Sequence, residues 1–143
     1  MDRILGLDFG AKTVGVAVSD PLLITAQGVE VIRRKSGNKL RRTLARLEEL
    51  AAEYGVGRVV VGNPLHMSGE AGVRSQKSAE FAEMVKKRLN VPVELYDERL
   101  TTVQADRAMD ELAIGKEERK AVVDEIAAIL ILQGYLDRMN RGH

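Results

Sequence analysis

The sequence predicts an α/β fold: one five-stranded mixed sheet flanked by helices, in a single domain over residues 1–143. Two observations predict it. The first part of the chain contains three short apolar segments separated by turn residues, which is typical of antiparallel strands. The rest alternates strand-like and helix-like segments, which is typical of parallel strands joined by helical crossovers. A chain of this length can bury one core.

The antiparallel part comes first. Arg3–Phe9 and Thr13–Ser19 are short and rich in Val, Ile and Leu, and Gly10-Ala11-Lys12 between them predicts a tight turn. Ile24–Arg34 follows the Asp20-Pro21 turn and alternates apolar with polar residues, so we expect a third, partly exposed strand. The three strands together form a meander.

The first crossover helix is expected after Asn38, a residue that can cap it, and ends at Gly55 and Gly57. Its apolar stripe is Leu40, Leu44, Leu47 and Ala51. The apolar segment Arg58–Gly62 then predicts a buried strand. The loop Gly62–Gly72 is long for a connector and contains three glycines and one proline, so we expect it to act as a mobile flap.

Three further helices and one strand complete the prediction. The helix after the loop carries Phe81, Met84, Val85 and Leu89 on one stripe and ends at Asn90 and Pro92. A strand is expected at Val93–Tyr96. The next helix is capped by Thr101 or Thr102 and carries Ala105, Ala108, Met109 and Leu112. The closing helix is expected over Lys116–Asn140.

Composition excludes several classes of site and location. The chain has no cysteine and two histidines, which removes disulfides and thiolate chemistry and leaves oxygen as the ligand for any metal. The longest apolar run, Ile126–Leu132, is too short to span a bilayer. No signal-peptide pattern follows Met1, so we expect a cytoplasmic protein that does not bind membranes.

Two acidic residues fall at the ends of predicted strands. Asp8 lies in an apolar strand, where a carboxylate is costly unless something compensates its charge. A metal ion would do so, and a bond to the backbone of the Gly10 turn is the alternative. Glu98 follows the strand at Val93–Tyr96, and its alternatives are an ion pair with Arg99 or a charge at the start of a helix.

A third acid opens the closing helix. Asp124 and Glu125 precede Ile126–Leu132, a run that leaves the helix without an obvious solvated face. Asp124 shares its helical position with Ala128 and with two further residues, Ile131 and Tyr135, but periodicity alone does not choose between Asp124 and Glu125. Two strand-end acids and one helical acid suit Mg²⁺ or Mn²⁺ and match two-metal hydrolysis of phosphodiester bonds.

Basic residues indicate contact with phosphate. The segment Arg33–Arg46 holds seven basic residues and no acid, and a solvated basic helix face is the alternative. The side chains expected to track a nucleic-acid backbone are Arg41, Arg42 and Arg46. Four further candidates for a phosphate contact are Lys12, Arg74, Thr101 and Thr102, each with a helix cap or a surface charge as its alternative role.

Four motifs carry a resemblance to a known family. They are Leu7-Asp8-Phe9-Gly10-Ala11-Lys12-Thr13-Val14-Gly15-Val16-Ala17, Val61-Gly62-Asn63-Pro64-Leu65, Asp97-Glu98-Arg99-Leu100-Thr101-Thr102 and Asp124-Glu125-Ile126-Ala127-Ala128-Ile129-Leu130. In order and over nearly the whole chain, they resemble the YqgF family, known as pre-16S ribosomal RNA nucleases and as Holliday junction resolvases. Asn63 and His66 depart from the family pattern.

The resemblance implies a ribonuclease H-like fold and a metal-dependent nuclease. It implies that Asp8, Glu98 and Asp124 form the catalytic, metal-binding triad, which decides for Asp124 over Glu125. The expected substrate is structured RNA of the ribosomal precursor, within a pre-ribosomal particle, and the alternative is a four-way DNA junction. A monomer and a homodimer are both open.

Two readings from other classes compete. Asp8-Phe9-Gly10-Ala11-Lys12-Thr13 also resembles the first phosphate-binding hairpin of actin-like ATPases and sugar kinases. Those proteins need a second lobe and a later Asp-Gly-Gly-type motif, and 143 residues hold neither. The other reading is a catalytically silent RNA-binding module for ribosome assembly, which metal-dependent cleavage would exclude.

Overall fold

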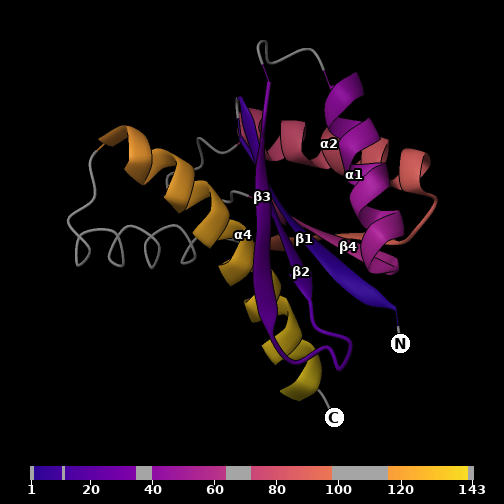
Figure 1. Ribbon diagram of the computed structural model, residues 1–143. Helices are drawn as coiled ribbons and strands as arrows, with labels where there is room; N and C mark the ends of the chain where they lie inside the picture. Colours follow the sequence, from indigo (N-terminus) through magenta and orange to yellow (C-terminus); the bar gives the residue numbers. More distant parts are fainter. Residues whose placement is uncertain (1, 11, 35–39, 64–71, 98–115, 142–143) are drawn as a thin grey trace.

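The computed structural model describes residues 2–10, 12–34, 40–63, 72–97 and 116–141 (Figure 1). Within these ranges, only the backbone path is described for residues 72–75, 97 and 116–124.

A five-stranded mixed sheet forms the centre, with strand order β3-β2-β1-β4-β5. The strands are β1 (Arg3–Phe9), β2 (Thr13–Ser19), β3 (Ala26–Arg33), β4 (Val56–Asn63) and β5 (Val93–Asp97). The helices are α1 (Arg41–Tyr54), α2 (Gly72–Leu89) and α4 (Lys116–Arg141). β1 pairs antiparallel with β2, as predicted, and parallel with β4, which joins the meander to the parallel strands in one mixed sheet. The helix predicted over Thr101–Leu112 lies outside the described residues.

The meander agrees with the prediction except at the ends of its third strand. The turn between β1 and β2 is closed by a hydrogen bond from the Gly10 N–H to the Thr13 carbonyl at 2.8 Å. β3 begins at Ala26 rather than Ile24, because the Asp20 carboxylate accepts hydrogen bonds from the backbone N–H groups of Ile24 and Thr25 and holds them in the turn. β3 ends one residue before Arg34.

The boundaries of α1 correct one prediction and confirm another. Asn38 is not the cap: Leu40 is the N-cap residue, and no side chain caps the helix. Gly55 ends the helix with φ 65°, a left-handed conformation that glycine adopts without steric cost, and its N–H bonds the Ala51 carbonyl. Gly57 belongs to β4, which begins at Val56 rather than Arg58.

Helices cover both faces of the sheet, with α1 and α2 on one side and α4 on the other (Figure 1). Leu5 and Leu7 point into the first core, together with Leu47 and Phe81 from the helices. The prediction that Met84 lies on the buried stripe of α2 is wrong. Met84 is 41% exposed, because the residues that pack against the sheet are Phe81, Val85 and Leu89.

The second core lies between the sheet and α4 and contains Ile4, Ala17 and Val60. The helix approaches β1 closely at Gly6, where a Cβ atom would lie 2.6 Å from Leu132 Cβ and 3.3 Å from the Ala128 carbonyl. The run Ile126–Leu132 of α4 is buried or half-buried throughout, and the helix becomes solvated only beyond it, where Asp137 and Arg138 are exposed. Within the described part of the chain, no helix is long and apolar enough to cross a membrane.

Candidate active site

Asp8 lies near the carboxyl end of the central strand β1, on the sheet face that α4 covers. Ile4 belongs to the α4 core, whereas Leu5 and Leu7 belong to the α1/α2 core. Side chains of a strand alternate between faces, so Gly6 and Asp8 share the face of Ile4. Asp8 is partly buried, and its strand partner is Gly15 of β2.

The N-terminal part of α4 lies toward the Asp8 end of β1. Ile4 pairs with Arg58, whose guanidinium donates to the Tyr135 hydroxyl at 2.8 Å, whereas Gly6 contacts Ala128. The helix therefore runs antiparallel to β1. Asp8 lies two residues beyond Gly6, about 7 Å farther along the strand. The residue four positions before Ala128 lies about 6 Å back along the helix axis, in the same direction. Asp124 holds that position in the backbone of α4.

Glu125 occupies a different side of α4. Its carboxylate packs over Gly28 of β3, where a Cβ atom would overlap it. Gly28 pairs with Ala17, and Ala17 pairs with Gly6, so Glu125 lies two strands away from β1. By contrast, Tyr135, in the same helical row as Asp124, contacts Arg58 of β4 and Tyr96 of β5. The described residues of this row, Ala128 and Tyr135, therefore face β1, β4 and β5.

The third predicted acid follows β5 directly. β5 runs parallel to β4, and its last residue, Asp97, pairs with Asn63, the last residue of β4. Glu98 comes next in the chain and lies outside the described residues, as do Thr101 and Thr102. Within the described part, no group of three or more His, Cys, Asp or Glu side chains could hold a metal ion. Of the predicted triad, only the Asp8 side chain belongs to that part.

Arg34 supports the turn that follows Asp8, a role that the sequence analysis did not anticipate. It is 8% exposed, its guanidinium lies 4.8 Å over the Phe9 ring, and it donates to the Gly10 carbonyl at 2.7 Å. Phe9 in turn stacks on Phe81 with ring centroids 4.2 Å apart. Burial lowers the pKa of Arg34. In sequence, Arg34 looks like one more member of a basic run.

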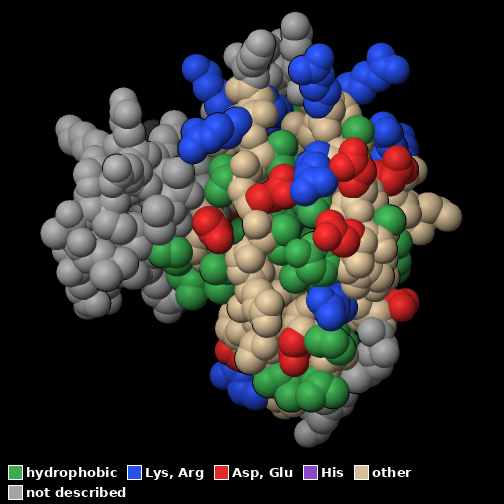
Figure 2. Space-filling view, viewed as in Figure 1, with side chains coloured by type: hydrophobic (Ala, Val, Ile, Leu, Met, Phe, Trp, Pro, Cys, Tyr) green, Lys and Arg blue, Asp and Glu red, His purple; other side chains and the backbone are tan. Residues whose placement is uncertain are grey.

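Exposed basic residues gather at the same end of the sheet. Lys12 is in the turn after β1, Arg33 pairs with Thr13, and α1 begins with Arg41 and Arg42. Figure 2 shows lysine and arginine side chains crowded at the top of the molecule, above the start of α1. Arg74 is the third residue of α2, and its side chain is not described.

Arg46 is engaged within the protein. Its guanidinium forms ion pairs with Glu30 of β3 at 2.7 Å and with Glu49 at 2.9 Å. The hydrogen bonds that Arg46 donates to these carboxylates, Glu30 first, raise the pKa of Arg46. The sequence predicts that Arg46 faces outward with Arg42, but these two ion pairs hold its guanidinium against carboxylates of the protein.

Solved structures with the same architecture define the class of fold. "T. thermophilus RuvC in complex with Holliday junction substrate" superimposes with a TM-score of 0.57 at 19% identity, covering 97% of this chain and 96% of that one. The fowlpox virus resolvase in complex with Holliday junction DNA gives a TM-score of 0.56 at 12% identity, covering 96% and 98%. The fold is therefore the ribonuclease H-like fold of RuvC-type resolvases, as expected.

The chain belongs to the RuvX family, whose model, described as "Holliday junction resolvase", matches residues 2–138. A protein of Agathobacter rectalis named "Putative pre-16S rRNA nuclease" is 62% identical over 138 residues, covering 96% of each chain. A protein of the same name from Clostridium acetobutylicum is 49% identical, covering 94% of this chain and 98% of that one. The family resemblance seen in the sequence is thereby confirmed.

Proposed function

We propose that this protein is a metal-dependent nuclease that hydrolyses phosphodiester bonds during maturation of the 5′ end of pre-16S ribosomal RNA. One observation carries the proposal: Asp8, at the carboxyl end of the central strand, shares a sheet face with α4, and the close contact at Gly6 sets the helical position of Asp124 level with it. Family membership and the names of the relatives support the nuclease class. A ribosomal RNA substrate implies work in the cytoplasm.

In this proposal Asp8, Glu98 and Asp124 hold the metal ions. Their chemistry fits Mg²⁺ or Mn²⁺, since all three offer hard oxygen ligands and the chain has no cysteine. Two ions held this way would lower the pKa of the attacking water and stabilise the negative charge on the leaving oxygen. Without cations, three neighbouring carboxylates repel one another and a phosphate.

The exposed basic residues of the same end supply the phosphate contacts. Lys12, Arg41 and Arg42 are exposed and lie beside the Asp8 end of the sheet. Because contacts to phosphate fix the position of a duplex without reading its bases, these residues position the substrate and do not select its sequence. Arg74, Thr101 and Thr102 complete the proposed set of phosphate contacts, and Arg46 joins it only if substrate displaces Glu30 or Glu49.

Resolution of four-way DNA junctions is the second candidate. The family description and the two junction-bound structures of the same fold favour it. The discriminating experiment incubates the purified protein with Mg²⁺ or Mn²⁺ and, side by side, precursor 16S rRNA and a synthetic four-way junction. Cleavage of the RNA alone is the expected result. Cleavage of the junction alone would overturn the proposal in favour of junction resolution. Binding of either substrate without cleavage would favour the non-catalytic assembly module.

A further inference from the structure

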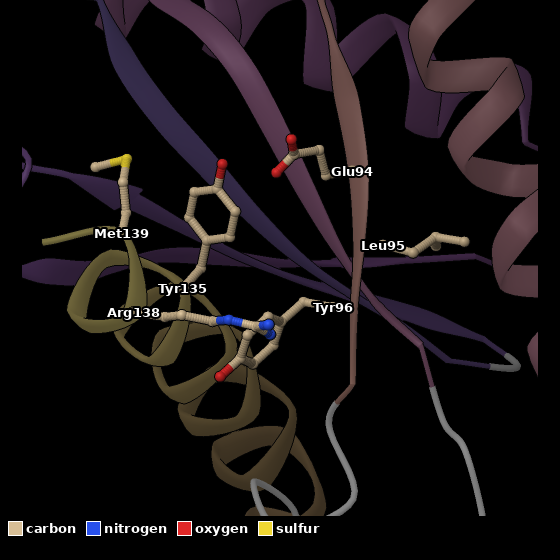
Figure 3. A pocket seen from close by; sticks show the side chains of 6 residues that line it. All are labelled: Glu94, Leu95, Tyr96, Tyr135, Arg138 and Met139. Atoms are coloured by element: carbon tan, nitrogen blue, oxygen red, sulfur yellow. The ribbon is translucent and has the colours of Figure 1, made fainter. Parts of the chain in front are cut away.

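A pocket of about 380 Å³ opens between β5 and α4, on the sheet face that carries Asp8 (Figure 3). Its lining residues are Glu94, Leu95, Tyr96, Tyr135, Arg138 and Met139. The volume falls near the lower end of the range for small-molecule sites, ~300–1,000 Å³. None of these residues belongs to the proposed catalytic or phosphate-binding set.

Two tyrosine rings shape the pocket. The rings of Tyr96 and Tyr135 lie 6.4 Å apart between centroids and meet at 82°, so one ring offers a face where the other offers an edge. The Tyr96 hydroxyl packs against Gly134 of α4, where a Cβ atom would lie 2.7 Å from it. Glycine at this position therefore lets Tyr96 reach the helix.

The orientation of Tyr135 is fixed from two strands. Its hydroxyl accepts a hydrogen bond from Arg58 of β4 at 2.8 Å and interacts with the Glu94 carboxylate of β5. Burial, followed by the interaction with Glu94, raises the pKa of Tyr135 above its ordinary value. The ring is held ready for a ligand and need not be ordered by it.

The polar groups at the rim suit a nucleotide. Arg138 is exposed beside the tyrosines and can contact a phosphate, and the exposed Glu94 carboxylate can accept from the amino or imino groups of a base or from a ribose hydroxyl. Flat aromatic faces stack on bases of any sequence.

The pocket reaches toward the proposed cleavage site at its Tyr96 end. Gly62 pairs with Tyr96, and Leu7 pairs with Val61, so Asp8 and Tyr96 are at the same level of the sheet, two strands or about 10 Å apart. Tyr135 bonds Arg58, which pairs with Ile4, so this side of the pocket lies about 13 Å back along β1 from Asp8. A few nucleotides of one strand can span the distance from the pocket to the cleavage site.

We propose that this pocket binds one unpaired nucleobase of the substrate strand, a few nucleotides from the phosphodiester bond that is cleaved. The inference rests on the proposed function and adds to it a requirement for a single-stranded nucleotide near the cleavage site. It favours the end of a precursor RNA, where bases are free to leave the stack, over a fully paired duplex arm.

The test measures binding of a short fluorescein-labelled single-stranded RNA in EDTA, so that cleavage does not contribute. Tyr135→Leu keeps apolar volume but removes the ring face, and it should weaken binding roughly tenfold, within the range known for base–aromatic stacking. Arg138→Gln, at an exposed position where folding is not at risk, should weaken it less. Tyr54→Leu, the same substitution on α1 behind the opposite face of the sheet, is the matched control and should change nothing.

A second arm replaces one base of the RNA at a time by an abasic site. One abasic position should weaken wild-type binding as much as Tyr135→Leu does and should have no further effect in that variant. Gly134→Ala, which favours the helix but displaces Tyr96, should also reduce affinity. Equal binding by Tyr135→Leu, Gly134→Ala and Tyr54→Leu, or no sensitive base, would overturn the inference. Cleavage of precursor rRNA with Mg²⁺, assayed in parallel, tests the proposed function separately.

Discussion

The Glu125 carboxylate lies over Gly28 of β3, at the edge of the sheet away from the proposed catalytic centre. Asp124, one residue earlier, shares its helical row with Ala128, Ile131 and Tyr135, which pack toward β1, β4 and β5. Two adjacent acids of one helix are thereby assigned to different parts of the molecule.

Substitution of these two acids should therefore give opposite results. Asp124→Asn should abolish metal-dependent cleavage, and Glu125→Gln should keep most of it, because the neutral amide still fits over Gly28. Initial cleavage rates of the two variants, with folding checked by circular dichroism, make the comparison. If Glu125→Gln is as inactive as Asp124→Asn, the assignment of the helical acid is wrong.

The contact at Gly6 predicts a coupled loss of stability and activity. Gly6→Ala places a methyl group against Leu132 and the Ala128 carbonyl, and the overpacking should cost about 1–3 kcal/mol of unfolding free energy. It should also reduce cleavage, because α4 must move away from β1 and from Asp8.

Gly55→Ala is the matched control for Gly6→Ala. It forces alanine into a left-handed conformation, but a Cβ atom there meets nothing within 4 Å. It should cost roughly 1 kcal/mol in urea denaturation and leave activity intact. Full activity of Gly6→Ala despite its lower stability would show that the spacing between α4 and β1 does not set the catalytic geometry.

The basic residues separate into substrate contacts and internal ion pairs. Each phosphate contact adds about −0.9 to the slope of log affinity against log salt for a duplex, so Arg41→Gln with Arg42→Gln should flatten that slope by about 2. Arg46→Gln should change the slope less and lower stability only slightly, since its pairs with Glu30 and Glu49 are partly exposed and screened by solvent.

Salt titrations of nucleic-acid binding by the two variants decide between these roles. An unchanged slope for the double variant would leave Arg41 and Arg42 as solvated surface charges. A drop for Arg46→Gln as large as that of the double variant would instead show that Arg46 leaves its carboxylate partners to meet phosphate.

Asp20 predicts a dependence of stability on pH. Hydrogen bonds from the N–H groups of Thr25 and Ile24 lower the pKa of Asp20 below its ordinary value of 3.8. A carboxyl whose pKa is depressed on folding adds stability above its unfolded pKa, and that stability is lost as the pH falls through the folded value. Melting temperatures of the wild type and Asp20→Asn should therefore differ at pH 6 and converge below pH 3.8. A difference that stays constant as the pH falls well below 3.8 would contradict the prediction.

Much of this architecture can be read from the sequence, because its signals are local. The short segments Arg3–Phe9 and Thr13–Ser19, rich in Val, Ile and Leu and separated by turn residues, predicted both strands with their observed ends. The predicted cap of α1 was wrong: the helix begins at Arg41 after Leu40, and no side chain caps it. Met84 was wrong because an apolar residue at helical spacing can still lie just outside the packed stripe.

The candidate site was less accessible to sequence reasoning. Asp8 was identified by its cost in an apolar strand, and its place at the covered sheet face agrees with that reasoning. The Tyr96–Tyr135 pocket was missed, since its residues are far apart in the chain and only the antiparallel course of α4 brings them together. The spacing of Glu94 and Tyr96, two residues apart in β5 and so on one face of the sheet, was the available signal.

The most direct test of the account is cleavage of precursor 16S rRNA by Asp8→Asn across a titration of Mg²⁺ or Mn²⁺. Removing a metal ligand should reduce the rate at least roughly 100-fold at every metal concentration. The variant should keep its fold and melt in EDTA at a temperature no lower than the wild type, because one of several repelling charges is gone. Glu98→Gln should behave alike. Wild-type rates in Asp8→Asn, or loss of its folded signal, would contradict the claim that Asp8 is a catalytic ligand and not a structural part of the turn.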